Sequence, residues 1–375
     1  MNKIYLLLTI FLLSSTVKLQ AQASFATRVV ADNLFIPWEI VYGPDDHIWF
    51  TQKNGYVCRL NPSTGTIDTL LLESQNVVRG EGGMLGLAIH PTFISDPYVF
   101  VAYQYEDGSD YKERVVKYTY ANNTLINPQV LIDDIEGGNI HNGCRLEIVA
   151  DKLFITTGDA GNTALAQNLS SLNGKVLRIN LDGSIPSDNP MAGSAVWSWG
   201  HRNAQGLAYH NGIMYSSEHG PNNDDEVNII NMGRNYGWPN VQGFCNTPSE
   251  ITFCADSNVV EPLYAWTPTI AVSGMAYYNH PMFPSYANTL LMTTLKDSKL
   301  YKLQLNAAGD SITNIISLPD LNYGRLRDIT VSPDGRIFIS TSNSPASGNG
   351  AKTDKIIELY DSTLTNIYNL MPDNG

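Results

Sequence analysis

Basic residues are scarce in this 375-residue sequence. It has 23 Lys and Arg residues against 36 Asp and Glu residues, and its formal net charge is -13 at pH 7. A surface of that sign repels nucleic acid and anionic membranes, so no nucleic-acid partner is expected. It suits neutral small molecules and bound cations instead. Hydrophobic residues make up 43% of the chain, which is enough for a large buried core.

Long hydrophobic runs are also missing. The apolar run at residues 4–13 is too short to span a bilayer, and no later stretch is a candidate. With Lys3 before it and the exit LQAQ after it, this run is typical of a secretory signal. Residues 1–22 are therefore predicted to be a signal peptide, and no cysteine follows it to carry a lipid anchor. We expect a periplasmic or secreted protein without a membrane span, either a monomer or a homodimer.

Cysteine is rare too, with four in the chain. Cys245 and Cys254 flank NTPSEITF, which is rich in turn formers and is predicted to be a loop closed by a disulfide, as in many exported proteins. Cys58 and Cys144 lie in strand-like contexts. For these two, buried thiols acting as small hydrophobes are favoured over a second disulfide.

Helical periodicity is absent over any long stretch, whereas short runs of β-branched and aromatic residues recur between Gly, Pro, Asn and Asp. A unit repeats six times: an apolar strand, a turn such as PDG, a second strand that ends in Thr or Ser, and a third strand after a polar gap. Such repetition predicts an all-β fold, a six-bladed β-propeller of four-stranded antiparallel blades. We expect it to span residues 23–362, with residues 363–375 as a C-terminal tail.

Ring closure is expected to involve the opening strand ATRVVAD, which would pair with the last blade because an unpaired edge is a liability. The alternative architecture is a pair of β-sandwiches. The regular register of the repeats argues against it.

Polar clusters accompany the first strand of each unit. They include RGEGGMLGLAIHP, HNGCRLEI, TTGDAGN, GHRNAQGLAYH, SEHGPNNDDEVN, WTPTIAVSG, TTLKDSKL and GRLRDITVSPDG. In a propeller such positions converge on one end of the central channel. They would bring together a histidine, several cations, carboxylates and backbone carbonyls. This combination predicts a site for a polyanionic ligand with a hard cation.

These motifs, in this order, resemble the soluble sugar dehydrogenases that depend on pyrroloquinoline quinone (PQQ), the glucose/sorbosone dehydrogenase family. The resemblance extends from IPWEI to IIEL and also includes GKVLRI and GWPN. It implies an enzyme that oxidises the C1 hydroxyl of aldose sugars to lactones. Hydride would pass to C5 of the quinone, and the cofactors would be PQQ and Ca²⁺. The sequence specifies neither the sugar nor the electron acceptor.

The resemblance also implies roles for residues near the reaction. His141 matches the general base, and histidine suits this role because its ordinary pKa of about 6.5 is close to working pH. Asp159 matches the carboxylate that orients that histidine. Arg202 and Asn203 match the pair that lies against the cofactor, where the arginine would polarise the quinone oxygen. The alternative for Arg202 is an ion pair with Glu218 or Asp225.

Further residues match the family's cofactor contacts. Lys296, Arg325 and Arg327 correspond to the cations that hold the three carboxylates of PQQ, and Thr269 corresponds to a hydroxyl contact. Glu81 stands where some relatives have glutamine, near the sugar and the base. Its charge would change sugar preference or be neutralised by Arg79.

The metal site is implied at Gly220 and Pro221, whose backbone carbonyls match those that coordinate calcium. The acidic run Asp224, Asp225 and Glu226 is instead expected to be a solvated loop or a partner for arginines. Replacing Asp225 is therefore expected to have little effect.

Some features depart from the family pattern or stay ambiguous. Cys144 stands where glycine is common, and its side chain would crowd the cofactor or form a disulfide. Trp266 would stack on the cofactor or pack within a blade. The loops that cover the substrate in glucose-specific members are shortened here, which suggests a more open pocket.

Two other functions are consistent with a propeller. One is an exported binding module without cofactor, against which the retained set of cations argues. The other is a calcium-dependent lactonase, which would need side-chain carboxylates and amides at the channel centre, where this sequence places cations.

Overall fold

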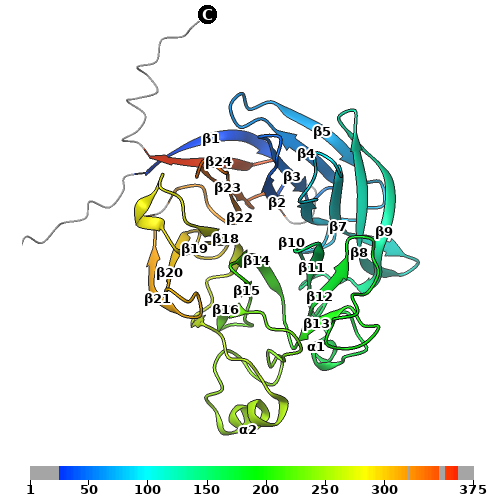
Figure 1. The fold of residues 1–375 in the computed structure, drawn as a ribbon, viewed down its shortest axis with the longest axis vertical. Coiled ribbons are helices and arrows are strands. Elements are labelled where there is room, and N and C mark those ends of the chain that lie inside the picture. Colours follow the sequence, from blue (N-terminus) through cyan, green and yellow to red (C-terminus); the bar gives the residue numbers. More distant parts are fainter. Residues whose placement is uncertain (1–24, 320, 346–350, 362–375) are drawn as a thin grey trace, which may run out of the picture.

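Six four-stranded antiparallel sheets make up the fold and surround a central channel (Figure 1). The structure is a computed structural model that describes residues 25–319, 321–345 and 351–361. The predicted signal peptide at residues 1–22 and tail at residues 363–375 lie outside the described residues. Within them, the six-bladed β-propeller is confirmed.

The first three blades follow one another along the chain. Their strands, from the channel outwards, are β2 (Pro37–Tyr42), β3 (Ile48–Gln52), β4 (Tyr56–Leu60) and β5 (Ile67–Leu72); β6 (Met84–Ile89), β7 (Tyr98–Asp107), β8 (Asp110–Ala121) and β9 (Thr124–Glu136); and β10 (Gly143–Val149), β11 (Lys152–Thr157), β12 (Lys175–Asn180) and β13 (Val196–Trp199).

The next two blades repeat this order, and the last one combines the first and the last of the described strands. Their strands are β14 (Ala204–His210), β15 (Ile213–Glu218), β16 (Asp225–Ile229) and β17 (Tyr264–Trp266); β18 (Val272–Tyr278), β19 (Thr289–Thr294), β20 (Leu300–Leu305) and β21 (Ile312–Ser317); and β22 (Leu326–Val331), β23 (Ile337–Thr341), β24 (Asp354–Asp361) and β1 (Phe25–Leu34).

Ring closure occurs in the last blade, as predicted. Strand β1 pairs antiparallel with β24, with Val29 opposite Ile357, and the two lie side by side in blue and red in Figure 1. The first and last parts of the chain therefore share one sheet, which removes a free edge from the ring.

Packing between blades forms the core. Strand β3, with the sequence IWFTQ, is buried at all five positions, because both faces of its sheet contact neighbouring blades. The innermost strand of each blade, from β2 round to β22, borders the channel. Loops at the ends of these strands are thereby brought together from distant parts of the sequence.

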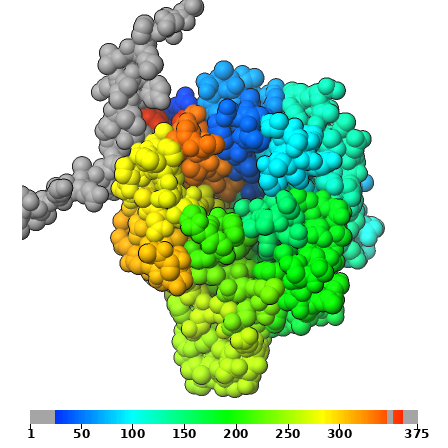
Figure 2. All heavy atoms as spheres, viewed as in Figure 1, coloured from blue at the N-terminus to red at the C-terminus, as the bar shows by residue number. Residues whose placement is uncertain are grey.

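The segment between Cys245 and Cys254 differs from the prediction. The disulfide forms, but the expected loop contains a helix, α2 (Pro248–Ser257). Thr247 and Glu250 form a reciprocal capping box at its start, and this pattern can be read in the sequence as TPSE. The helix buries none of its residues and projects from the ring at the bottom of Figures 1 and 2.

Two shorter helical turns complete the described structure, α1 (Ala164–Gln167) and η1 (Pro284–Tyr286). In the described parts of the chain, no helix has the length and hydrophobicity needed to cross a membrane. Cys58 and Cys144 are buried free thiols, as expected.

Candidate active site

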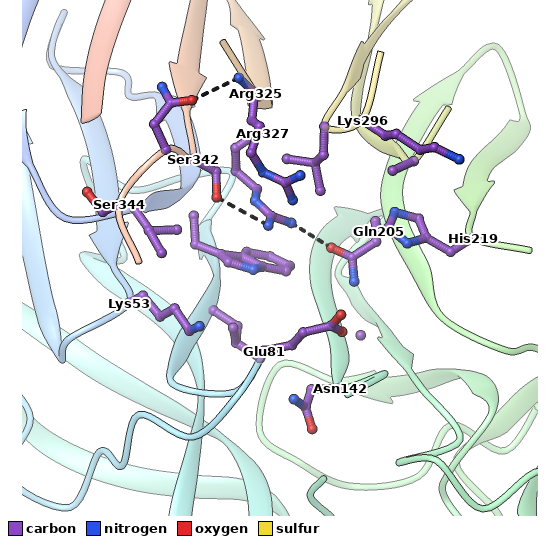
Figure 3. Close-up of a pocket in the computed structure, with 17 residues that line it drawn as sticks. Lys53, Glu81, Asn142, Gln205, His219, Lys296, Arg325, Arg327, Ser342 and Ser344 are labelled. Carbon is purple, nitrogen blue, oxygen red and sulfur yellow. Dashed lines mark hydrogen bonds between the residues drawn. The ribbon is translucent and has the colours of Figure 1, made fainter. Parts of the chain in front are cut away.

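A cavity of about 540 Å³ opens at one end of the channel (Figure 3). It is lined by the first residues of the inner strands, by the loops that precede them, and by residues that directly follow the second strands of several blades. Four of the predicted cofactor residues line it: Glu81, Lys296, Arg325 and Arg327. A second cavity, of about 460 Å³, is lined by the opposite halves of the same strands and contains none of the predicted site residues. The first cavity is therefore the candidate site.

Positive charge dominates this cavity. The Lys296 Nζ donates to Thr269 Oγ1 at 3.0 Å, and the Arg327 Nη1 donates to Gln205 Oε1 at 2.8 Å. Among the described residues, no carboxylate forms an ion pair with Lys296, Arg325 or Arg327. Asp297 instead binds Lys299, and Asp328 binds Arg145. Burial, together with Arg325 and Arg145, lowers the pKa of Arg327 to about 10.

Two lining residues near these cations were not anticipated from the sequence. Lys53 is 3% exposed and donates to Gly80 O at 2.5 Å. Burial and the neighbouring Arg327 lower the pKa of Lys53 to about 8, while Glu81 opposes the shift. Trp38 lies in the channel with the guanidinium carbons of Arg145 and Arg327 at 4.4 and 5.8 Å from its ring centroid. The sequence feature that could have identified Trp38 is its position in IPWEI, at the start of the first inner strand.

His141 and Asp159 form a pair beside the cavity, which the next residue, Asn142, lines. The His141 Nδ1 lies 2.6 Å from Asp159 Oδ1, and the Asp159 side chain is fully buried. Burial alone would raise the pKa of Asp159. The hydrogen bond and charge of His141, with the N–H groups of Gly161 and Trp238, lower this pKa below its ordinary value. The carboxylate is therefore charged and oriented at neutral pH.

Glycine brings these two residues together. A side chain at Gly158 would collide with the backbone carbonyl of His141, so only glycine allows the end of β11 to approach the loop before β10 this closely. The backbone N–H of His141 donates to Glu81 Oε2 at 2.9 Å, which connects the pair to the cavity lining. Arg79 does not pair with Glu81, since its guanidinium lies 3.9 Å from the Tyr111 ring centroid.

Arg202 and Asn203 lie beside this pair. The Arg202 Nη1 donates to the backbone carbonyl of His219 at 3.2 Å, and His219 lines the cavity. Neither alternative ion pair, with Glu218 or with Asp225, is formed: one Glu218 oxygen binds His201 at 2.9 Å and the other accepts from the backbone N–H groups of Arg202 and Asn203. The Asn203 Oδ1 accepts from Gly143 N at 3.1 Å. Within the described residues, the Arg202 Nε and Asn203 Nδ2 are buried without hydrogen-bond partners.

Gly220 and Pro221 lie in a smaller hollow of about 20 Å³ that also contains Arg202 and Trp238. The prediction for the neighbouring acidic run was wrong for Asp225, which is 1% exposed. Its carboxylate accepts from Gly220 N at 2.8 Å and from the backbone N–H groups of Ile270 and Ala271 at 2.8 and 2.6 Å. Asp225 thus fixes the loop that contains Gly220.

Asp225→Asn is accordingly expected to lower the free energy of unfolding by about 1–3 kcal/mol, because an amide NH₂ would face backbone donors that the carboxylate now satisfies. Urea unfolding measures this loss. Asp224→Asn is the matched control, since Asp224 binds the Thr267 hydroxyl at the surface. Equal stability of the two variants would contradict this role for Asp225.

Two ambiguous residues are also placed. Trp266 lies on β17, the outer strand of blade four, with its ring centroid 6.0 Å from that of Tyr301 on β20 of blade five, so it packs between two blades. Cys144 does not line the cavity, and its Sγ lies 3.3 Å from Glu113 Oε2 in the core. Its φ of 66° explains why glycine suits this position.

Metal ligation by clustered side chains is not evident. No group of three or more His, Cys, Asp or Glu side chains within the described ranges is arranged to hold an ion.

The fold and site define a six-bladed propeller whose channel ends in a cationic cavity beside a His–Asp pair. The family model for glucose/sorbosone dehydrogenase matches residues 34–349. The chain belongs to this family, as the sequence motifs indicated.

Several characterised relatives are similar over most of their length. The aldose sugar dehydrogenase YliI of Escherichia coli is 31% identical over 346 residues, which cover 86% of this chain and 92% of that protein. Quinoprotein glucose dehydrogenase B of Acinetobacter calcoaceticus is 30% identical over 420 residues, with 88% and 87% coverage. The PQQ-bound aldose sugar dehydrogenase of Streptomyces coelicolor has a structure with a TM-score of 0.77, 31% identity, and coverage of 90% of this chain and 98% of that one.

Proposed function

We propose that this chain is an exported, PQQ-dependent dehydrogenase that oxidises the C1 hydroxyl of aldose sugars to lactones. One observation carries the proposal: three cations without carboxylate partners among the described residues, Lys296, Arg325 and Arg327, line a cavity beside the His141–Asp159 pair. The PQQ-bound and quinoprotein relatives support the choice of ligand.

The residues present fit PQQ, which has three carboxylates. The Nε of Arg327, one of these cations, is also a buried donor without a partner among the described residues, as are Asn142 Nδ2 and Asn203 Nδ2. Unsatisfied buried donors are unfavourable, so a ligand rich in oxygen acceptors would stabilise them. When bound, PQQ supplies a quinone that accepts the hydride from the sugar.

The chain's own residues would handle the proton. Because charged Asp159 accepts the Nδ1–H of His141, the Nε2 of that histidine carries a lone pair and can take the proton of the C1 hydroxyl. Asp159 would then stabilise the imidazolium. Arg202 would stabilise the negative charge that develops on the quinone oxygen of bound PQQ.

Calcium is proposed to bind the backbone carbonyls of Gly220 and Pro221. Asp225 supports this assignment because it fixes the loop through the Gly220 N–H and leaves the carbonyl oxygens as the available ligands. Export is supported by the predicted signal at residues 1–22 and by the Cys245–Cys254 disulfide, which suits an oxidising compartment.

Reconstitution tests the proposal. Protein purified without cofactor is expected to reduce an artificial dye with aldoses only after PQQ and calcium are both added. A chelator added before PQQ should prevent this gain. Dye reduction that needs PQQ but resists chelation would overturn the calcium assignment alone. If no dye is reduced and the melting temperature does not change when PQQ is added, the assignment as a dehydrogenase is wrong. Hydrolysis of lactones without PQQ would favour the lactonase.

A further inference from the structure

Trp238, in the GWPN segment, contacts the acid of the His–Asp pair. Its indole Nε1–H donates to Asp159 Oδ2 at 2.8 Å. The other carboxylate oxygen, Oδ1, accepts from His141 Nδ1 at 2.6 Å and from Gly161 N at 2.8 Å. Both oxygens of the buried carboxylate therefore have donors, and Trp238 provides the one to Oδ2.

The backbone of Trp238 is bound to blade three and to the connection that follows it. The Trp238 backbone N–H donates to Gly200 O at 3.0 Å, and its carbonyl accepts from Gln167 Nε2 at 2.7 Å. Its ring centroid lies 5.4 Å from the Arg202 guanidinium carbon. One side chain thus contacts Asp159 in blade three and approaches Arg202 in the loop before β14.

The segment that contains Trp238 lies between β16 and β17 and also includes α2 and the Cys245–Cys254 disulfide. Gly243, further along the same segment, donates its N–H to Glu226 Oε1 at 2.8 Å. This segment is therefore attached to blade four through Gly243 and to the region of blade three through Trp238.

From this geometry we infer that Trp238 is a positioning residue whose indole N–H holds Asp159 in the orientation that binds His141. The inference rests on the proposed function, in which that pair takes the substrate proton. Trp238 itself touches neither substrate nor reacting atoms in this scheme. It acts through Asp159, so its effect is on turnover more than on sugar binding.

Loss of the indole N–H has a defined electrostatic consequence. The charged or titratable groups that face Asp159 are His141 and Arg202, and both remain in a Trp238 variant. A carboxylate that loses a hydrogen-bond donor has a higher pKa. Since the pair works with Asp159 ionised, the acid limb of the pH profile of kcat/KM should move to higher pH.

Trp238→Phe removes the N–H and keeps an aromatic ring. In reconstituted enzyme we expect kcat to fall about tenfold, a typical size for the loss of an outer hydrogen bond to an active group, with KM changed by less than about threefold. Without cofactor, the ¹³C titration of the Asp159 carboxyl should shift to higher pH. Should this variant fail to fold, 3-benzothienylalanine at position 238 provides a similar ring without the N–H.

Trp197→Phe is the matched control. Trp197 lies on β13 with an Arg178 guanidinium 4.8 Å from its ring, and its buried Nε1 has no hydrogen-bond partner among the described residues. This variant should leave the carboxyl titration, the pH profile and kcat unchanged.

The two possible failures are distinguishable. A wild-type protein that shows no dehydrogenase activity after reconstitution would contradict the proposed function. An active wild type, with a Trp238 variant whose kcat, pH profile and Asp159 titration match those of the wild type, would overturn the positioning role alone. A fall in kcat without any change in the Asp159 titration would also overturn it, because the effect would not pass through the carboxylate.

Discussion

His141→Ala is expected to lower turnover with aldoses by about two to four powers of ten, the usual contribution of a positioned general base. The imidazole is already oriented for this role, because its Nδ1 is bound to Asp159 at 2.6 Å. Alanine leaves the hydroxyl proton without an acceptor at that place. Steady-state dye reduction with reconstituted enzyme measures the loss.

PQQ affinity should change much less in this variant, since imidazole is not one of the cations of the cavity. Titration of the cofactor, followed by thermal melting, separates binding from chemistry. A variant with near-normal turnover would show that His141 is not the base. Glu81 would then be the next candidate, because its carboxylate lies 2.9 Å from the His141 backbone nitrogen.

The fold could be predicted because the repeating unit is a local pattern. Alternation within short strands and turn residues between them specify one blade, and six copies specify the ring. Closure through β1 followed from the unpaired strand at the start. The helix α2 was missed because it has no buried face and so no apolar period, although its capping box is present in the sequence.

The site could be predicted only in part, because the roles of some residues depend on how deeply their side chains are buried, which the sequence does not show. Asp225 and Lys53 resemble ordinary surface charges in the sequence, yet they are 1% and 3% exposed in the folded chain. Cys144 was expected to crowd the cofactor or to form a disulfide, and it is a free thiol. A register shift between Gly143 and Leu146 in β10 accompanies its positive φ, and its side chain lies in the core.

Arg327→Ala and Lys296→Ala are each expected to weaken PQQ binding by about one to two powers of ten. A charge-assisted contact in a partly dry cavity contributes about 1.5–3 kcal/mol, and 1.4 kcal/mol corresponds to a factor of ten. Calorimetric titration of PQQ in the presence of calcium measures the change. Lys299→Ala is the control, because Lys299 is paired with Asp297 at 3.3 Å and does not line the cavity.

The cofactor-free protein should respond in the opposite sense to the same substitutions. Burial and neighbouring arginines lower the pKa of Arg327 to about 10, so the folded chain holds this charge unfavourably when no anion is present. Removing either cation should leave the melting temperature of the empty protein unchanged or slightly higher, while the increase on adding PQQ and calcium becomes smaller. If these cations instead formed structural ion pairs, the cofactor-free variants would have lower melting temperatures than the wild type and would bind PQQ with normal affinity. That result would mean that these cations stabilise the propeller and that the carboxylates of PQQ, if it binds, are held elsewhere.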